Sequence, residues 1–318
     1  MEFRKYNLRH PSGIHATILN YGARLHEFGV AKGHNIVVPM SSTSEYLTCT
    51  GYQNATIGPL ANIVRDGEIL LTNKSVQLDK NYGSHSLHSG KDGYDKKFWT
   101  LVFYQDCVLK LMLTDSNRLN NEVIFVYVIF ELTSAGLNIT YEADSNTEMW
   151  MNMTNHCYFN LVGEKNIYNH WIFVNANQVV DTDKDNIPMP TVSNIEDENE
   201  RLLELKVLAT TKSSVISKRL KKNSGFNHCY LLNKTKEHAV VLSHSSAKAN
   251  LAIITTKPAL QLYTTNHPTA LGNSISTVHG AVCLEPMYPT NDYFKQEEAL
   301  SYIPFGKKYR ETDSYHFI

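Results

Sequence analysis

The chain has 318 residues, enough to bury a substantial core as one large all-β domain or as two average domains. Its hydrophobic fraction of 42% and charged fraction of 19% are typical of a folded globular protein and exclude an intrinsically disordered one. Lys and Arg total 30 against 31 for Asp and Glu, so the charge balance gives no reason to expect nucleic acid or an anionic membrane as partner.

The amino terminus, residues 1–7, is charged and has no apolar run behind it, so no signal peptide is expected. No segment is apolar for long enough to span a bilayer. The five cysteines are odd in number, widely spaced and without a Cys-x-x-Cys pair, which indicates reduced thiols. Together these features predict a cytoplasmic protein.

The first part of the chain reads as short strands punctuated by Gly and Asn, a pattern typical of β-meanders. The predicted strands are His15–Asn20, Leu25–Val30 and Ile36–Val38. Further on, apolar residues alternate within Cys107–Leu113 and again within Leu137–Tyr141, as in strands with one buried face.

The run Val123–Phe130 is continuously apolar and rich in β-branched and aromatic residues, which predicts a strand covered on both faces. Later strand candidates are Trp171–Ala176, Ala239–Ser243 and Leu251–Thr256, and the best helical segment is Glu196–Val207. Many strands, few helices and no obvious linker predict a large antiparallel β-sandwich forming one domain over 1–318.

The stretch Asn152–Leu161 places a histidine, His156, among asparagines and aromatics just after an apolar strand. Asn and Thr side chains at such a turn can hydrogen-bond the backbone and hold the histidine in place. A held histidine of this kind can be a proton donor, a metal ligand or a satisfied core residue, and these ten residues alone leave all three open.

Other polar clusters also fall at predicted strand ends or loops. Each is individually typical of a turn, a surface carboxylate or a histidine bonded to its own loop, but two histidines, one carboxylate and nearby amides together suggest an acid–base site for a polyhydroxylated ligand. The clusters are Gly58–Gly67, His85–Lys96, Gly225–His228, Thr256–Thr264 and Cys283–Pro286.

Four of these segments, in this order along the chain, resemble the aldose 1-epimerases, also called galactose mutarotases. The carboxyl end, with Ile303–Gly306 followed by Tyr315–Phe317, is similar to the end of that family as well. The resemblance covers essentially the whole chain, and its most specific motif is the octapeptide around His156. The four segments are Leu87–Gly90, Thr154–Leu161, Thr256–Tyr263 and Leu284–Pro286.

The resemblance implies a large antiparallel β-sandwich with an open sugar cleft, no cofactor and no metal. It implies an isomerase that interconverts the α and β anomers of a free hexose by opening and closing the ring. By position, His156 matches the general acid and Glu285 the general base, while His88 matches a histidine that bonds near the ring oxygen. Asn62, Gln261 and Asn227 match residues that hold sugar hydroxyls, the last standing where the family has an aspartate. The expected partner is a monosaccharide, and the protein is expected to be a monomer or homodimer.

These roles agree with ordinary side-chain chemistry. An unperturbed glutamate is ionised at neutral pH and can accept a proton, whereas an imidazole titrates near ~6.5 and can donate one. A carboxylate close to a histidine favours the charged imidazole, so we expect an ionised Glu285 and a protonated His156. The acidic limb of a pH profile should then report mainly the carboxylate and the basic limb mainly the imidazole.

Two departures from the family pattern concern the sugar-reading residues. Ile63 stands where the family has an arginine, and Arg65 lies two positions on, on the same face if this segment is a strand. Asn227 stands where the family has an aspartate, and the family's Gly-Thr-Pro-Phe-Asp-Phe segment has no clear match within Thr191–Leu205.

Two other classes of function compete with the enzyme. One is a metallohydrolase with His88, His156 and Glu285 as zinc ligands, although no His-Glu-x-x-His spacing supports it. The other is a sugar-binding or sensing protein that has lost turnover, for which Ile63 and Asn227 are the motivation.

Overall fold

The computed structural model describes residues 2–72, 74–117, 122–195, 202–204, 218–233, 238–267, 277–295 and 298–318. Within these ranges the chain is built almost wholly from strands, with one short α-helix, α1 (Lys218–Asn223). Every strand ladder of the described residues is antiparallel. The predicted antiparallel all-β class is therefore confirmed.

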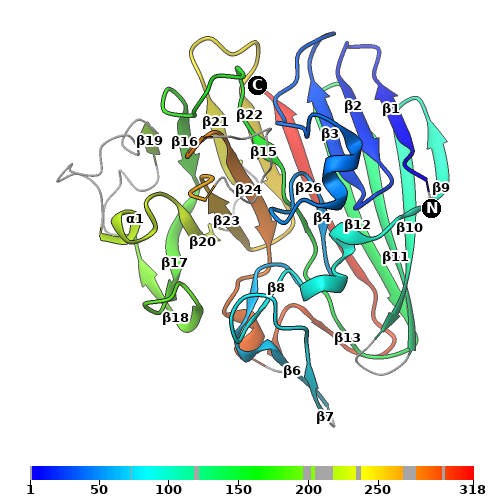
Figure 1. The fold of residues 1–318 in the computed structure, drawn as a ribbon, viewed down its shortest axis with the longest axis vertical. Helices are drawn as coiled ribbons and strands as arrows, with labels where there is room; N and C mark the ends of the chain where they lie inside the picture. The colour runs from blue at the N-terminus through cyan, green and yellow to red at the C-terminus, as the bar shows by residue number, and fades with distance from the viewer. Residues whose placement is uncertain are drawn as a thin grey trace.

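The larger sheet has nine strands, and its longest strands lie side by side (Figure 1). In β12, Leu137, Ile139 and Tyr141 point to the core and are fully buried, as their alternation predicts. In spatial order the strands are β19 (Leu202–Glu204), β16 (Trp171–Val174), β21 (Val240–Ser243), β22 (Leu251–Thr255), β26 (Tyr309–Phe317), β12 (Gly136–Ser145), β11 (Glu122–Leu132), β10 (Val108–Asn117) and β9 (Thr100–Gln105).

The prediction that residues 123–130 form a strand covered on both faces is wrong in its second part. The strand exists as β11, but Val123 and Phe125 are 45% and 44% exposed, while Ile124 and Val126 between them are buried. The outer face of this sheet is open to solvent at these positions, and a continuous apolar run does not by itself reveal such a one-sided burial.

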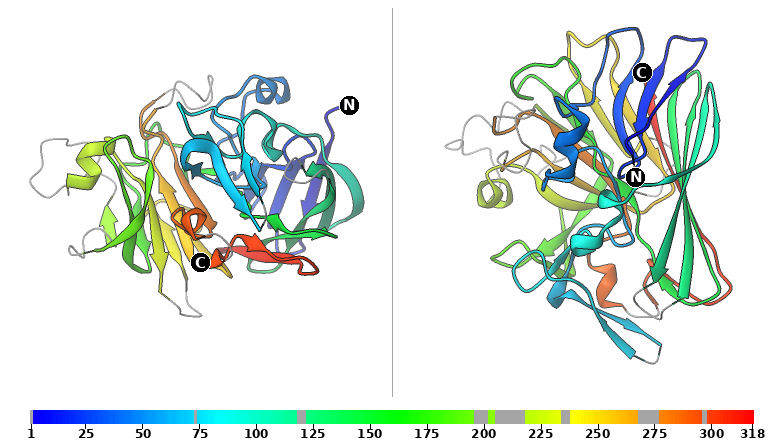
Figure 2. Two further views of the ribbon diagram at one scale, coloured as in Figure 1. Left: turned by 90° about the horizontal axis from the view of Figure 1, so that it is seen from below. Right: turned by 45° about the vertical axis from the view of Figure 1, so that its right-hand side comes forward.

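The second sheet has six strands and stands to the left of β9–β12 in Figure 1. A large buried cluster joins it to the nine-stranded sheet, and Figure 2 shows the two sheets from two further sides. In spatial order the strands are β15 (Tyr158–Phe159), β24 (Val282–Met287), β23 (Ala259–Tyr263), β20 (Asn227–Leu232), β17 (Ala176–Thr182) and β18 (Pro188–Asn194).

A buried ion pair also connects the two sheets. Lys257 Nζ, just before β23, lies 2.7 Å from Asp313 Oδ2 on β26, and both side chains are fully buried. The same ammonium group donates to the carbonyl of Pro286 at 3.3 Å and lies 4.3 Å above the ring centre of Tyr141. This pair therefore supports β24 from the core side, directly after Glu285.

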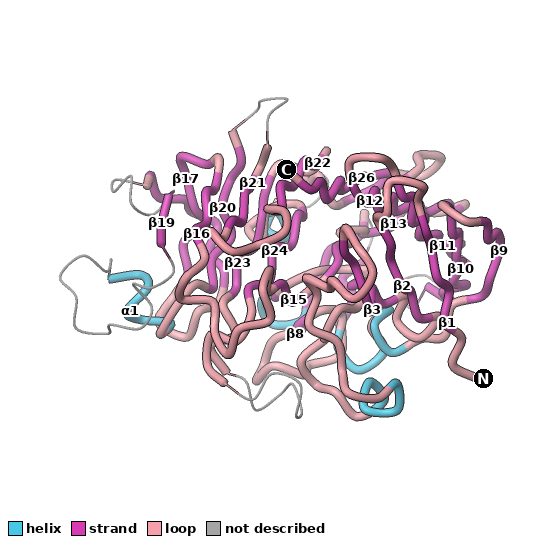
Figure 3. The backbone as a smooth tube through the Cα atoms, turned by 90° about the horizontal axis from the view of Figure 1, so that it is seen from above, coloured by secondary structure: helices cyan, strands magenta, loops and turns pink. Residues whose placement is uncertain are grey.

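Smaller sheets complete the fold, and loops gather along one side of the strands in Figure 3. They are β1 (Lys5–Arg9) with β2 (His15–Leu19) and β3 (Arg24–Gly29), and the pairs β4 (Thr56–Ile57) with β14 (Thr154–Asn155), β5 (Ile63–Val64) with β8 (Ser86–Leu87), β6 (Glu68–Leu71) with β7 (Lys74–Gln77), and β13 (Met149–Trp150) with β25 (Tyr302–Ile303).

Two local predictions are wrong. Residues 36–38 form no strand, because only Val37 makes an isolated bridge, to Phe159. Within the predicted helix 196–207 the described residues Leu202–Glu204 form β19, which pairs with β16 at one end of the nine-stranded sheet, and the other residues lie outside the described ranges. Among the described residues no helix has the length and apolar character of a membrane span.

Candidate active site

All six residues singled out from the sequence line one cavity of about 540 Å³. They come from six separate segments of the chain, which the sheets and loops bring together. A cavity of this size lies within the usual range for small-molecule sites, roughly 300–1,000 Å³. The six residues are Asn62, His88, His156, Asn227, Gln261 and Glu285.

The six-stranded sheet provides one wall of the cavity. Gln261 on β23 and Glu285 on β24 are direct cross-strand partners, so both side chains leave the same face of the sheet. Asn227 begins β20, the neighbouring strand on the other side of β23. His156 enters from the opposite side, in the turn between β14 and β15.

His156 and Glu285 form the centre of the cavity. Their Nε2 and Oε1 atoms are 3.6 Å apart, and the two residues are only 6% and 2% exposed. Two tyrosine rings stack against the imidazole, Tyr158 at 5.1 Å and Tyr52 at 6.0 Å between ring centres, with interplanar angles of 28° and 30°. The rings fix the plane of the imidazole, so its Nε2 is held toward the carboxyl group.

Burial opposes charge on both members of this pair. It raises the pKa of Glu285 to about 8 and lowers the pKa of His156 to about 4, the latter against a smaller opposite effect of the histidine's own backbone. The expectation of an ionised Glu285 beside a protonated His156 therefore does not hold. Both pKa shifts favour a neutral carboxyl group beside a neutral imidazole.

His88 is held in one tautomer by the backbone of Asn62. The backbone N–H of Asn62 donates to the ring Nδ1 of His88 at 3.1 Å, and the backbone N–H of His88 donates to the Asn62 carbonyl at 3.0 Å. Burial, and then the neighbouring His156 and Lys96, hold the pKa of His88 well below its ordinary value, so the ring is neutral. With Nδ1 accepting, the proton of the neutral ring sits on Nε2 and is available as a donor.

The same tautomer decides against the metal interpretation. His88, His156 and Glu285 each offer an atom within 4.8 Å of the others, a spacing that could hold an ion. A ring nitrogen that carries a proton cannot coordinate a metal, and freeing Nε2 of His88 requires breaking its bond from Asn62. The donor set therefore fits hydrogen bonding to a ligand better than zinc coordination.

Three residues that line this cavity have a strained backbone. Tyr52, Asn62 and His88 have φ of 57°, 65° and 51°, a left-handed conformation that residues with side chains rarely adopt. Such strain persists only where surrounding contacts impose it. It sets the direction in which these three side chains, from three separate loops, enter the cavity.

The amide of Asn227 is bonded to its neighbour rather than left open. Gln261 Nε2 donates to Asn227 Oδ1 at 2.8 Å, so the Asn227 carbonyl is used by the protein and its NH₂ group remains for a ligand. An aspartate at this position would offer a second acceptor oxygen instead. The change at 227 therefore alters the hydrogen-bonding polarity of the cavity as well as its charge.

Ile63 lines the cavity, but Arg65 does not replace the missing arginine there. The chain turns into a 3₁₀ segment after β5, and Arg65 pairs with Asp183 at 2.9 Å and with the Pro188 carbonyl at 3.1 Å. β5 ends at Val64, so the strand geometry on which the expected position of Arg65 depended does not extend to this residue.

Several residues that line the cavity were not singled out from the sequence. Tyr158 lies within the octapeptide around His156, and Lys91 and Lys96 lie within the His85–Lys96 cluster. Lys96 Nζ is 5.5 Å from the ring centre of Tyr52, which in turn contacts His88 edge-on at 4.5 Å. Their membership in a recognised cluster was the available signal, but only the fold shows which of its lysines face the cavity.

The fold and the cavity define an all-β sandwich with a buried acid–base pair in a sugar-sized cleft. The family model described as aldose 1-epimerase matches residues 4–316. The chain belongs to the aldose 1-epimerase family.

Similar proteins agree with this membership. The galactose mutarotase of Sus scrofa is 27% identical over 297 residues, covering 90% of this chain and 84% of the relative. The aldose 1-epimerase of Escherichia coli is 27% identical over 275 residues, covering 83% and 79%.

Solved structures share the fold. An aldose epimerase homologue from C. elegans has a TM-score of 0.87 at 18% identity, covering 100% of this chain and 99% of that one. The galactose 1-epimerase from Lactobacillus acidophilus has a TM-score of 0.84 at 24% identity, covering 100% and 98%. The predicted galactose mutarotase-type sandwich is confirmed.

Proposed function

We propose that this protein is an aldose 1-epimerase that interconverts the α and β anomers of a sugar by acid–base opening and closure of its ring. The observation that carries the proposal is the buried contact of 3.6 Å between His156 Nε2 and Glu285 Oε1 inside the cavity. Family membership supports the same reaction class. No cofactor and no metal take part in the proposed steps.

Ring opening requires two proton movements. A base takes the proton of the anomeric hydroxyl while an acid gives a proton to the ring oxygen, and the C1–C2 bond then rotates before closure. In the proposed roles Glu285 is the base and His156 the acid, which needs the ionised form of the pair. The neutral form of the pair carries the same number of protons, so the two forms differ only in which partner holds the proton that is transferred.

Bound sugar can supply the energy for that internal shift. Hydroxyl groups that donate to Glu285 favour its carboxylate, and a ring oxygen near His156 Nε2 favours the protonated imidazole. His88, whose Nε2 carries a proton, is proposed to donate to the ring oxygen or a hydroxyl beside it. Asn62, Asn227 and Gln261 are proposed to hold other hydroxyls along the wall of the cavity.

Polarimetry tests the proposal directly. Freshly dissolved α-D-glucose and α-D-galactose should reach their equilibrium rotation faster with the protein than with buffer alone. The control is protein denatured by heat at the same concentration. Saturable binding of these sugars without any acceleration would instead favour a sugar-binding or sensing protein, for which the replacement at Ile63 gives the motivation.

Ile63 and Asn227 are also proposed to lower the affinity and the selectivity with which the cavity binds individual sugar hydroxyls. An isoleucine offers no donor, and each missing charge-assisted hydrogen bond should weaken binding by roughly 1.5–3 kcal/mol. We expect a high KM for galactose and a narrow spread between galactose, glucose and a deoxy sugar. The double variant Ile63→Arg/Asn227→Asp should bind galactose at least about tenfold more tightly. If the double variant gains neither affinity nor selectivity, Ile63 and Asn227 do not reduce the recognition of sugar hydroxyls.

A further inference from the structure

The polar side chains of the cavity turn donors, rather than acceptors, toward a ligand. Asn62 Oδ1 accepts from the Ile63 N–H at 2.8 Å, which leaves Nδ2, whose contact is Met287 Sδ at 4.0 Å. Asn227 Oδ1 likewise accepts from Gln261, and His88 presents its Nε2–H. Three different side chains thus reach the cavity with N–H groups because the protein already uses their acceptor atoms.

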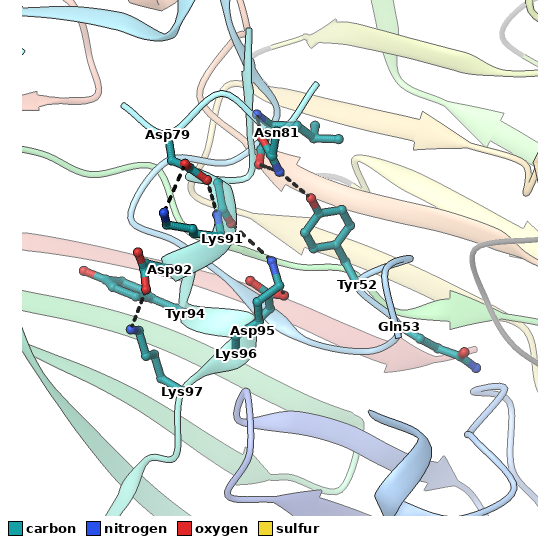
Figure 4. Close-up of polar contacts among 12 residues, drawn as sticks. Tyr52, Gln53, Asp79, Asn81, Lys91, Asp92, Tyr94, Asp95, Lys96 and Lys97 are labelled. Carbon is teal, nitrogen blue, oxygen red and sulfur yellow. Dashed lines mark hydrogen bonds and ion pairs between the residues drawn. The ribbon is translucent and has the colours of Figure 1, made fainter. Parts of the chain in front are cut away.

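Two ammonium groups add to these donors, and Figure 4 shows them with their partners. Lys91 Nζ lies 3.8 Å from Asp79, and its side chain is 74% exposed. Lys96 Nζ donates to the Gly90 carbonyl at 3.2 Å and lies 3.7 Å from Asp95. The contact with Asp79 is long and solvated, so it holds Lys91 weakly.

Acceptors are few, and they lie on the sheet side of the cavity. They are chiefly Gln261 Oε1 and the carboxyl of Glu285, which are cross-strand partners. Asp79 and Asp95 do not line the cavity, so Glu285 is the one acidic residue among its described lining. Burial raises the pKa of Glu285 to about 8, which favours its uncharged form at neutral pH, so the two lysines are the charged side chains that face the cavity while their carboxylate partners lie outside its lining.

We infer that the sugar on which this enzyme acts carries an oxyanion group, a carboxylate or a phosphate ester, which Lys91 and Lys96 bind while the anomeric centre lies at His156 and Glu285. The inference rests on the proposed function. A buried sugar hydroxyl loses free energy when its own hydrogen finds no acceptor, and this cavity has few acceptors for it. An oxyanion only accepts, and its bonds to ammonium groups are about twice as strong as neutral ones.

Anomer exchange measured by NMR or polarimetry for three sugar types tests the inference. The sugars are D-galactose and D-glucose, their 6-phosphates, and the corresponding uronates, all at low ionic strength. We expect kcat/KM for at least one anionic type to exceed that for the neutral sugars tenfold or more. Added salt of about 1 M should shrink this ratio, because the Debye length falls to about 3 Å.

Lysine variants test whether Lys91 and Lys96, rather than the neighbouring Lys97, cause the preference for anionic sugars. Lys91→Gln and Lys91→Gln/Lys96→Gln should lower the ratio of anionic to neutral kcat/KM toward one, mainly by raising KM for the anionic sugar. Lys97→Gln is the matched control, since Lys97 pairs with Asp92 at 3.4 Å in the same loop but does not line the cavity. Lys97→Gln should keep the parent ratio. Lys91 is largely exposed, so Lys91→Gln should fold even if the double variant does not.

The outcomes are distinct. A preference for the 6-phosphates alone assigns a phosphate ester, and a preference for the uronates alone assigns a carboxylate. Equal kcat/KM for neutral and anionic sugars, or a preference that survives Lys91→Gln/Lys96→Gln in folded protein, overturns the inference and leaves the proposed function standing. If no sugar of any type exchanges faster, the proposed function itself fails, and the inference with it.

Discussion

Among the histidine–carboxyl contacts of the described residues, two have nearly the same length but different surroundings. His156 and Glu285 are 3.6 Å apart in the cavity, and both are buried. His244 and Glu164 are 3.7 Å apart, but the side chain of Glu164 is 41% exposed. Distance alone therefore does not make an acid–base site; the removal of water from both partners and the cavity beside them distinguish the first pair.

A second comparison, between two lysine–tyrosine contacts of equal length, leads to the same conclusion. Lys257 over Tyr141 and Lys110 over Tyr127 are both 4.3 Å from the ring centre, and both have a carboxylate partner. Lys257 and its partner are fully buried, whereas the Lys110 side chain is 29% exposed. Contacts of similar geometry should therefore contribute unequally to catalysis and to the free energy of unfolding. Four measurements test this expectation.

The largest effect is expected from Glu285→Gln. This change removes the proposed base but keeps its shape, so anomer exchange should slow by about two to four powers of ten. Glu164→Gln is the matched control and should leave the rate of exchange within error of the parent. A Glu285→Gln variant as fast as the parent would show that the buried pair has no catalytic role.

The second effect concerns stability. Lys257→Met leaves Asp313 buried without its partner and should lower the free energy of unfolding by about 3–5 kcal/mol. Lys110→Met, which breaks the exposed counterpart, should cost about 1 kcal/mol or less. Urea unfolding of the two variants measures both. Equal losses would mean that burial does not set the strength of these pairs.

The third measurement is the pH dependence of kcat/KM. The pair carries one proton between its two apparent pKa values, near about 4 and about 8, so the rate should be nearly constant between them. Outside this window it should fall about tenfold per pH unit. The acidic limb then reports mainly His156 and the basic limb mainly Glu285, the reverse of the order expected from unperturbed side chains. A basic limb near pH 6.5 would contradict the structural assignment.

A fourth effect is a pH-dependent gain in stability for Glu285→Gln. The pKa of Glu285 is raised in the folded protein, so its contribution is most favourable below pH 4.5 and is lost as the pH rises toward about 8. The substituted glutamine side chain does not titrate, so the variant does not lose this stability as the pH rises. Its thermal midpoint should therefore exceed that of the parent by more at pH 8 than at pH 5. Glu164→Gln should show no such divergence.

Much of the fold could be predicted from alternation and turn residues, because the sheets bury one face. The alternating residues Leu137–Tyr141 form β12 as expected. The errors arose where tertiary pairing decides the outcome: Leu202–Glu204 pairs along β16, and the outer face of β11 at Phe125 meets solvent. Neither fact has a local signal in the sequence.

The candidate site was predicted as a set of residues but not in its electrostatics. His156, Glu285 and the four other candidates do line one cavity. The sequence could not show that burial would outweigh their mutual attraction, since desolvation depends on the whole surrounding fold. It also could not show that Gln261 uses the Asn227 carbonyl or that Arg65 turns away to Asp183.

The burial of Glu285 has a consequence for the whole catalytic cycle. In the proposed reaction, opening one anomer moves a proton from the sugar to Glu285 and another from His156 to the ring oxygen. Closure to the other anomer reverses both transfers, so the pair returns to its initial state without exchanging a proton with water. A carboxyl group that is only 2% exposed can therefore turn over repeatedly. The enzymatic rate should accordingly be independent of buffer concentration, even though spontaneous anomer exchange is accelerated by buffer.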